Sequence, residues 1–251
     1  MAYRKQLLKA VLLLVAFSHG QSAAAECVIL LHGLARTAKA MNTMETALVN
    51  EGFAVANIDY PSREHPIETL APAAIAKGIA ECGAKNDAPI HFVTHSMGGI
   101  LVRYYLKHNS LPNLGRVVML APPNQGSEVV DNLAAIPGFS RFNGPAGLQL
   151  GKDANSVPLS LGPVGYPVGV IAGNKTFNPI LSQFLPNPDD GKVSVARTKV
   201  EGMQDFLEVA VSHPFIMKDD VVISQVIAFL QTGSFRREKP IQNQPSKDDE
   251  R

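Results

Sequence analysis

Short apolar runs and amphipathic stretches alternate along most of the chain. Residues 27–31 read CVILL, without a polar side chain, and such a run predicts a strand that is buried on both faces of a sheet. Similar runs, rich in β-branched or aromatic residues and bounded by turn-forming residues, follow at intervals. We therefore predict six strands, at 27–31, 53–58, 89–94, 114–120, 168–173 and 206–211.

The segments between these strands carry helical signals. We predict helices at 38–51, 68–82, 100–108 and 220–230, from apolar residues near helical spacing and from stop signals such as Gly52. Alternating buried strands and helices predict an α/β fold, with a mostly parallel central sheet and helices on both faces. In such sheets the functional site lies at the carboxyl ends of the strands, so the candidate residues are sought in the turns that follow them.

Residues 124–167 break this alternation. They are rich in Gly, Pro, Asn and Ser, and a stretch this long without clear elements is usually functional or mobile. We interpret it as a short cap insertion over the site, which would shape an acyl pocket. The alternative is a structural excursion packed on the sheet edge. One amphipathic piece could form the apolar face of the cap: Val129, Val130, Leu133, Ile136 and Phe139.

The two ends of the chain differ in character from the middle. Residues 1–25 begin with basic side chains, continue with eight apolar residues from Ala10 to Phe17, and end in three alanines. This pattern predicts a secretory signal peptide cleaved after Ala25, because the apolar run is too short for a mature membrane span. The protein is therefore expected to be periplasmic or secreted. Residues 234–251 are polar and charged, and predict a disordered tail after a folded domain at 26–233.

Composition and charge exclude some classes of partner. Of the 251 residues, 45% are hydrophobic and 18% are charged, as in an ordinary globular protein. Without residues 1–25 the chain has 20 basic and 22 acidic residues, a formal charge of −2, and the folded part has no basic run. This gives no basis for nucleic acid binding. Two cysteines, Cys27 and Cys82, indicate a disulfide in a secreted protein, since a zinc site would need more ligands at closer spacing.

The strongest candidate chemistry lies where the strand at 89–94 meets the next helix. His95-Ser96-Met97-Gly98-Gly99 forms a strand-to-helix turn, the context that the nucleophile elbow G-x-S-x-G requires. Such a turn lifts the Ser96 hydroxyl above the sheet and aims the Met97 amide at a developing oxyanion. Thr94 stands where the motif has its first Gly, so the motif alone also fits a plain strand, turn and helix.

Other polar residues follow the strands in a fixed order. Leu31-His32-Gly33-Leu34 closes the first strand, Asp189-Asp190-Gly191 lies late in the chain, and His213 follows the last strand. Ser, acid, His is the chain order of α/β-hydrolases. On these motifs the chain resembles the α/β-hydrolase superfamily, and within it the small bacterial secreted lipases and esterases, from about Glu26 to Gly233.

The resemblance implies a serine carboxylic-ester hydrolase that works through an acyl-enzyme. Ser96 would be the nucleophile, which is weak at its free pKa and needs a neighbouring base. His213 would be that base, and Asp190 would fix its tautomer and stabilise its charged form. The family implies the backbone N–H groups of Leu34 and Met97 as the oxyanion hole. No cofactor or metal is expected.

The choice of carboxylate leaves an alternative. Asp190 precedes Gly191, which permits a tight turn that presents the side chain, whereas Asp189 follows a proline and suits a turn position facing solvent. We therefore favour Asp190. If neither adjacent carboxylate serves His213, Asp59 and Asp205 are the next candidates.

The remaining histidines are expected to have structural or surface positions. His95 neighbours the nucleophile in sequence, but adjacent side chains on an elbow point apart. His32 precedes the oxyanion loop and is expected to be a structural hydrogen bonder. His91, inside a strand, is expected to be a satisfied core residue, and His65 and His108 are expected at the surface.

The resemblance also pairs the two cysteines. Cys27 starts the first strand, and Cys82 ends the helix that leads to the elbow strand. In the family's sheet these two strands are parallel neighbours, so their starting ends lie at the same edge and a Cys27–Cys82 disulfide is implied.

The expected substrates are small or lipid-like carboxylic esters, with transient contact to a membrane surface. Two other functions remain open. One is acyl transfer from the same acyl-enzyme to an acceptor other than water, which product analysis with competing alcohols would separate. The other is a binding protein on a retired hydrolase fold, which labelling of Ser96 by a fluorophosphonate would decide.

Overall fold

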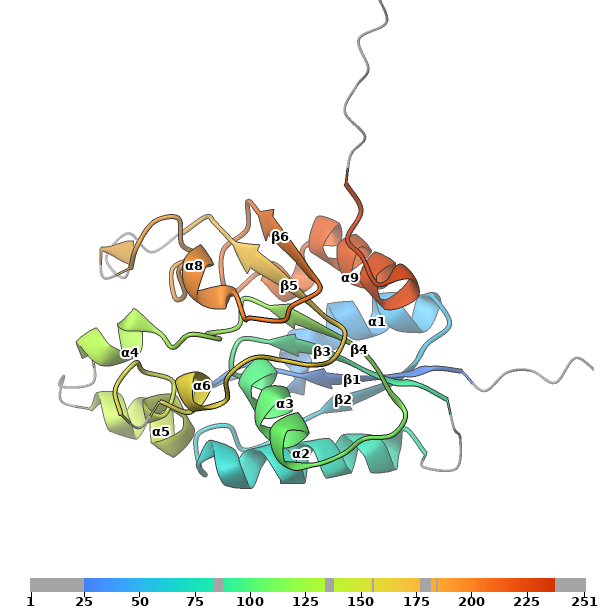
Figure 1. Ribbon diagram of the computed structural model, residues 1–251, viewed down its shortest axis with the longest axis horizontal. Coiled ribbons are helices and arrows are strands. Elements are labelled where there is room, and N and C mark those ends of the chain that lie inside the picture. Colours follow the sequence, from blue (N-terminus) through green and yellow to red (C-terminus); the bar gives the residue numbers. More distant parts are fainter. Residues whose placement is uncertain are drawn as a thin grey trace, which may run out of the picture.

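A parallel β-sheet forms the centre of the computed structural model (Figure 1). The structure describes residues 25–83, 88–133, 138–154, 156–176, 182–183 and 185–237. All strand pairs within the described ranges are parallel, so the predicted mostly parallel sheet is confirmed. Its six strands are β1 (Cys27–Leu31), β2 (Ala54–Ile58), β3 (Ile90–His95), β4 (Leu114–Leu120), β5 (Val168–Gly173) and β6 (Asp205–Val209).

The strand order places the candidate site residues at the middle of the sheet. The order is β2-β1-β3-β4-β5-β6, so the chain first adds β2 on one side of β1 and then crosses to β3 on the other side. Such a reversal opens a crevice at the carboxyl ends of the strands, and ligands of open α/β sheets bind in it. The turns after β1 and β3 both lie at this crevice, with Leu34 in one and Ser96 in the other.

Helices cover both faces of the sheet, as the sequence predicted (Figure 1). The helices α2 (Ile67–Glu81) and α3 (Met97–His108) pack on one face. The other face is covered by α1 (Asn42–Asn50), the 3-10 turn η2 (Ile216–Lys218) and α9 (Asp220–Thr232). A further 3-10 turn, η1 (Ala38–Met41), precedes α1.

Successive residues of the apolar strands point to opposite layers of the core. Ile29 and Leu31 of β1 pack in the layer under α2 and α3, whereas Val28 and Leu30 pack in the layer under α1 and α9. All five residues of β1 are buried. A strand with helices on both faces needs apolar side chains at every position, and this explains the uninterrupted run CVILL.

The predicted cap region has more regular structure than its composition indicates. It contains α4 (Glu128–Leu133), α5 (Phe139–Leu148) and α6 (Val157–Ser160), which gather at one end of the sheet (Figure 1). The helical pattern was hidden because α5 contains Gly144, with a φ of 67°, followed by Pro145. A further short helix, α8 (Val195–Thr198), lies between β5 and β6 in the chain.

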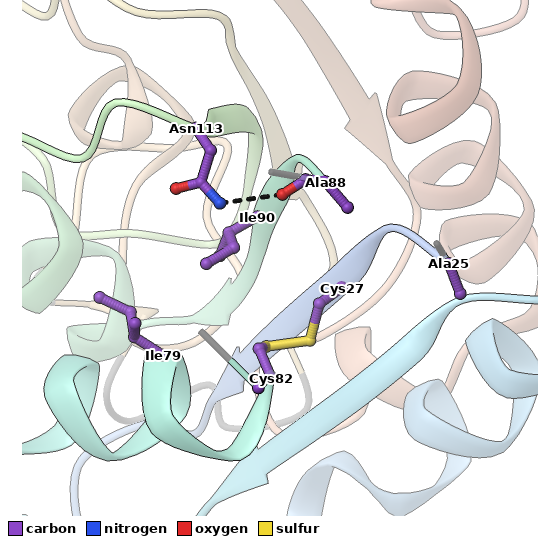
Figure 2. Close-up of a pocket in the computed structure, with 8 residues that line it drawn as sticks. Ala25, Cys27, Ile79, Cys82, Ala88, Ile90 and Asn113 are labelled. Atoms are coloured by element: carbon purple, nitrogen blue, oxygen red, sulfur yellow. Dashed lines mark hydrogen bonds between the residues drawn. A yellow bond between two sulfur atoms is a disulfide. The ribbon is translucent and has the colours of Figure 1, made fainter. Parts of the chain in front are cut away.

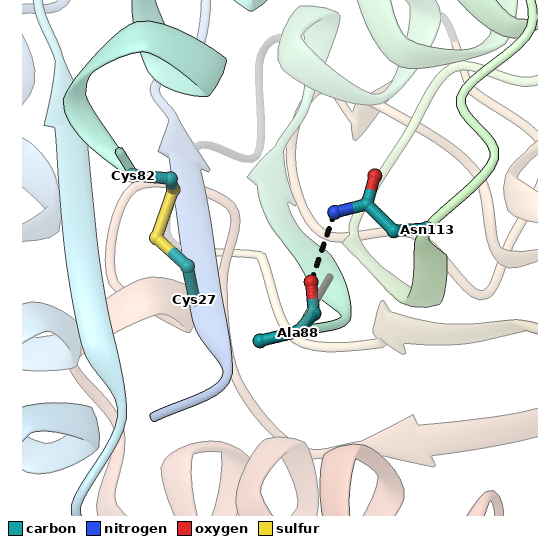
Figure 3. Close-up of a disulfide and its surroundings, with 4 residues drawn as sticks. All are labelled: Cys27, Cys82, Ala88 and Asn113. Carbon is teal, nitrogen blue, oxygen red and sulfur yellow. Dashed lines mark hydrogen bonds between the residues drawn. A yellow bond between two sulfur atoms is a disulfide. The ribbon is translucent and has the colours of Figure 1, made fainter. Parts of the chain in front are cut away.

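The disulfide implied by the resemblance is present between Cys27 and Cys82 (Figure 3). It joins the first residue of β1 to the residue that ends α2, with a Cα–Cα distance of 5.8 Å. A shallow hollow beside it also involves Ile79, Ile90 and Asn113, whose side chain donates a hydrogen bond of 2.9 Å to a neighbouring backbone carbonyl (Figure 2). Of the described residues that line this hollow, none is ionisable, and the hollow lies at the amino ends of the strands.

Removing the disulfide is expected to destabilise the protein substantially. The bridge closes a loop with a sequence separation of 55 residues, and a loop of that size contributes about 4 kcal/mol in the chain-entropy model. The double variant Cys27→Ala/Cys82→Ala should therefore lose roughly 3–4 kcal/mol of unfolding free energy in urea titrations. Thiol titration of the unfolded, unreduced wild type serves as the control, and two reactive thiols in it would reject the bridge.

The expected chain ends lie largely outside the described residues. Of the predicted signal peptide only Ala25 is described, and of the predicted tail only 234–237. The boundary expected after Gly233 comes too early, because Phe235 is 4% exposed, packs on the Phe229 ring and donates its N–H to Asp205. Within the described ranges no helix combines the length and apolar character needed to cross a membrane.

Candidate active site

Ser96 occupies a strained turn between β3 and α3. Its φ of 53° and ψ of −121° lie outside the conformations that non-glycine residues usually adopt. Gly98 is required by the close approach of β1, because a Cβ at this position would lie 2.6 Å from the Leu31 carbonyl oxygen. Thr94 fits in place of the motif's first Gly, since its buried hydroxyl donates to the Val118 carbonyl of β4 at 3.4 Å. The local sequence therefore forms the elbow despite its departure from the motif.

The structure brings Ser96, His213 and Asp190 into one hydrogen-bonded chain. His213 Nε2 lies 3.1 Å from Ser96 Oγ, and His213 Nδ1 lies 2.7 Å from Asp190 Oδ2. His213 is 4% exposed and Asp190 is fully buried. Because the carboxylate can only accept, Nδ1 carries the proton, and Nε2 is left as an acceptor for the Ser96 hydroxyl.

The loop that carries Asp190 fixes both carboxylate oxygens. The backbone N–H groups of Lys192 and Val193 donate to Asp190 Oδ1 at 3.0 and 2.8 Å. Oδ2 remains free to accept from the His213 imidazole. In addition, the backbone N–H of His213 donates to the backbone carbonyl of Asp190 at 2.9 Å. The turn depends on Gly191, whose φ is 94°. The sequence predicted this turn from Gly191, and the carboxylate it presents is that of Asp190.

Asp189 does not face solvent, contrary to the expectation from sequence. It is 2% exposed, and its carboxylate accepts hydrogen bonds from Ser182 Oγ at 2.6 Å and from the Gly191 N–H at 2.7 Å. These partners compensate the burial of the charge. Of the other two carboxylates considered, Asp59 accepts from the Ala38 N–H, and Asp205 pairs with Arg237. None of the three contacts His213.

The loop after β1 is held in place by residues that follow β2. The Tyr60 hydroxyl donates to the His32 carbonyl, and Ser62 Oγ accepts from the Ala35 N–H at 3.1 Å. Among the described residues the Leu34 N–H has no acceptor of its own. Met97 is the first residue of α3, where N–H groups lack intrahelical acceptors and the helix dipole is positive. The two predicted oxyanion amides thus lie in segments that flank Ser96.

His95 has a position that sequence reasoning missed. It is 2% exposed, its Nε2 lies 3.1 Å from the His213 carbonyl oxygen, and the two rings are 4.8 Å apart. Burial above all, and then the charges of His213 and Lys192, hold the pKa of His95 well below its usual value. A neutral His95 can donate from Nε2 and so supports the backbone of His213. No local signal could reveal this contact, because the partners are 118 residues apart in sequence.

The other two buried histidines occupy the structural positions expected of them. His32 stacks on Tyr60 with ring centroids 4.0 Å apart, and its Nδ1 lies 2.9 Å from the Gly33 carbonyl oxygen. His91 is satisfied on both nitrogens, by Glu26 at 2.9 Å and by the Arg116 N–H at 2.8 Å. Burial lowers the pKa of both imidazoles, so neither is tuned to act as a cation at neutral pH.

A pocket opens above Ser96 and His213. Its apolar lining comes from three segments: the loop after β1, residues 124–167 and the loop that carries Asp190. The apolar residues are Leu34, Val129, Val130, Leu150 and Val193. Val129 and Val130 belong to α4, so part of the segment at 124–167 lines the pocket. The structure does not describe Ile136 or the side chains of Leu133 and Phe139. Arg36 and Lys192 also line this pocket and bring two positive charges to it.

Comparisons with known proteins agree with this fold. The model of the alpha/beta hydrolase family matches residues 28–214. Mature lipase BlEst2 of Bacillus licheniformis is similar in structure, with a TM-score of 0.65 and 20% identity over 85% of this chain and 94% of that one. A search of curated proteins finds no match.

Two other solved structures resemble the chain. One is the metagenomic carboxyl esterase MGS0156, with a TM-score of 0.58 and 20% identity over 78% of this chain and 66% of that one. The other is phospholipase PlaB of Legionella pneumophila, with a TM-score of 0.53 and 21% identity over 70% of this chain and 46% of that one. At these identities the likenesses show the fold, and the chemistry has to be argued from the residues of this chain.

Proposed function

The chain belongs to the alpha/beta hydrolase family, and from that premise we propose that it is a serine carboxylic-ester hydrolase that works through an acyl-enzyme. One observation carries the proposal: Ser96, His213 and Asp190 form a continuous hydrogen-bonded chain at the floor of a pocket. Nucleophile, base and orienting carboxylate are the three parts that acyl transfer by a serine needs.

In the first half of the reaction, Ser96 Oγ attacks the ester carbonyl carbon while His213 Nε2 accepts the hydroxyl proton. The carbonyl oxygen becomes an oxyanion that accepts hydrogen bonds from the Leu34 and Met97 N–H groups, and one such donor is worth about 3–4 kcal/mol of barrier. The bond from carbon to the alcohol oxygen then breaks, and His213 gives its proton to that oxygen. The alcohol leaves, and the acyl group stays on Ser96.

In the second half, water replaces the alcohol. His213 takes a proton from the water as the water oxygen attacks the acyl carbon. The bond from the acyl carbon to Ser96 Oγ then breaks, His213 returns the proton to that oxygen, and the carboxylic acid leaves. Throughout, Asp190 keeps the Nδ1 proton in place and stabilises the imidazolium that forms transiently. The apolar lining of the pocket fits the hydrocarbon part of an acyl group.

The disulfide suits the periplasmic or secreted location that we propose, because such bonds persist in oxidising compartments. Two rival functions use the same fold. Acyl transfer would share every residue of the mechanism and differ only in the acceptor that attacks the acyl-enzyme. A binding protein would keep the pocket without turning over an ester.

The test combines turnover with labelling. The purified protein should hydrolyse p-nitrophenyl esters of graded chain length, and a fluorophosphonate probe should modify Ser96 in the folded protein, as mapped by mass spectrometry. Denatured protein is the control for nonspecific labelling. Absence of both turnover and Ser96 labelling would reject the hydrolase and favour the binding protein. Predominant transfer to an added alcohol at low concentration would instead favour the acyltransferase.

A further inference from the structure

Two cations border the pocket that contains Ser96. Arg36 and Lys192 both line it, and both side chains remain exposed. Among the described residues that line this pocket, none carries a carboxylate. The pocket above the candidate nucleophile therefore combines two positive charges with an apolar lining.

The backbone at both cations is fixed by the active-site loops themselves. Lys192 follows Gly191 directly, its N–H donates to Asp190 Oδ1 at 3.0 Å, and its carbonyl accepts from Ser127 Oγ at 3.2 Å. Arg36 lies two residues beyond the oxyanion residue Leu34, and its N–H donates to the Gly33 carbonyl at 3.3 Å. Arg36 and Lys192 thus each belong to a loop that also holds a residue of the proposed catalytic machinery, Leu34 or Asp190.

Neither cation has an ion-pair partner among the described residues. Elsewhere in the described chain, Arg197 pairs with Glu128 at 2.8 Å and Lys152 lies 3.7 Å from Asp131. No described carboxylate lies within ion-pair distance of Arg36 or Lys192. Although Lys192 is exposed, the protein packed around its ammonium group and then the Arg36 charge lower its pKa, against an opposing effect of Asp190. The two cations repel each other, and an anion between them would relieve that repulsion.

The position of the cations selects one half of the substrate. The acyl chain packs on the apolar lining, and the alcohol oxygen must face His213, which protonates it. The charges of Lys192 and Arg36 both act on His95, whose ring lies 4.8 Å from that of His213, so the two cations lie on the His213 side of the pocket, toward the alcohol. An arginine and a lysine together offer several N–H donors of the kind that bind phosphate and carboxylate groups.

Resting on the proposed ester hydrolase function, we propose that the substrate is an ester whose alcohol half carries an anionic group, a phosphate or a carboxylate, bound between Arg36 and Lys192. Binding of this group would orient the alcohol oxygen toward His213. Neutral esters of the same size would react at the same Ser96 without this attraction.

The test compares two soluble esters that differ by one charge on the alcohol half, 4-(butanoyloxy)benzoate and its methyl ester. The measured quantity is the ratio of kcat/KM for the charged ester to that for the neutral one. In the double variant Arg36→Gln/Lys192→Gln this ratio should fall about three- to tenfold at low salt, as for the loss of two exposed charge pairs. Added salt should lower the wild-type ratio in the same direction.

A matched control removes two charges outside this pocket. Lys39 and Lys218 line a neighbouring hollow, and the variant Lys39→Gln/Lys218→Gln should keep the wild-type ratio within about twofold. An unchanged ratio in Arg36→Gln/Lys192→Gln, with the neutral ester still hydrolysed, would overturn the proposal. An equal fall in the control would overturn it as well, because the effect would then be one of net charge.

Two further readouts keep the outcomes distinct. If the substitutions at Arg36 and Lys192 lower turnover only for esters presented in phosphatidylglycerol vesicles, the cations bind a lipid surface and the substrate proposal is wrong. If neither ester is hydrolysed and the fluorophosphonate does not label Ser96 in the wild type, the hydrolase function itself fails. An unfolding transition at the wild-type temperature, followed by circular dichroism, would verify that the double variant is folded.

Discussion

Replacing Ser96 by alanine is expected to remove nearly all ester hydrolysis and to leave the fold intact. The substitution deletes the attacking oxygen and its 3.1 Å contact with His213 Nε2, and no other described hydroxyl contacts that nitrogen. In triad hydrolases the loss of the nucleophile costs about 10⁶-fold in kcat. Alanine adopts the positive φ at this turn no better than serine, so the strain of the elbow is unchanged. The measurements are kcat on a p-nitrophenyl ester and thermal unfolding by circular dichroism.

The matched control is Ser224→Ala in α9. Its hydroxyl donates to the Val221 carbonyl, far along the chain from the pocket, and its loss should leave kcat at the wild-type value. A Ser96→Ala protein that keeps near-wild-type turnover would move the nucleophile elsewhere. Lost activity together with a lost unfolding transition would mean that the variant had not folded, and Ser96→Gly would then replace it.

The strands were predictable because each signal was local. The burial of β1 on both faces is visible in the sequence as an unbroken apolar run. The elbow at Ser96 is encoded by five consecutive residues. Asp190 could be favoured because its presentation depends on Gly191, the next residue. Where a feature depended on a few adjacent residues, the sequence was sufficient to predict what the structure brings together.

The features that were missed depend on contacts between distant segments or on residues hidden by average composition. Asp189 can be buried because Ser182 and the Gly191 N–H donate hydrogen bonds to its carboxylate. The residues next to Asp189 do not indicate that Ser182 would be its partner. His95 supports His213 across most of the chain. Phe235 is one apolar side chain in a polar stretch, and composition alone assigned it to the tail although it packs on Phe229.

The two adjacent carboxylates should respond very differently to amidation. In Asp190→Asn, the amide oxygen stays where the Lys192 and Val193 N–H groups donate to it, so the NH₂ group must face His213 Nδ1. Nδ1 then has to accept, the proton moves to Nε2, and Nε2 can no longer take the Ser96 proton. A wrong imidazole tautomer costs about 10⁴-fold in kcat in a triad enzyme, and we expect a loss of that size.

Asp189→Asn offers the matched comparison. It removes one buried charge from the residue that precedes Asp190 and leaves the hydrogen bond between Asp190 and His213 in place. Its Oδ1 can still accept from the Gly191 N–H, and the Ser182 hydroxyl can rotate to accept from the new NH₂ group. We expect less than about a tenfold loss of kcat and roughly 1 kcal/mol of lost stability, from the weaker hydrogen bonds of a neutral group. Steady-state kinetics and urea unfolding of both variants decide between them. A larger kcat loss in Asp189→Asn would make Asp189 the triad acid, and equal small losses would direct the search to Asp59 and Asp205.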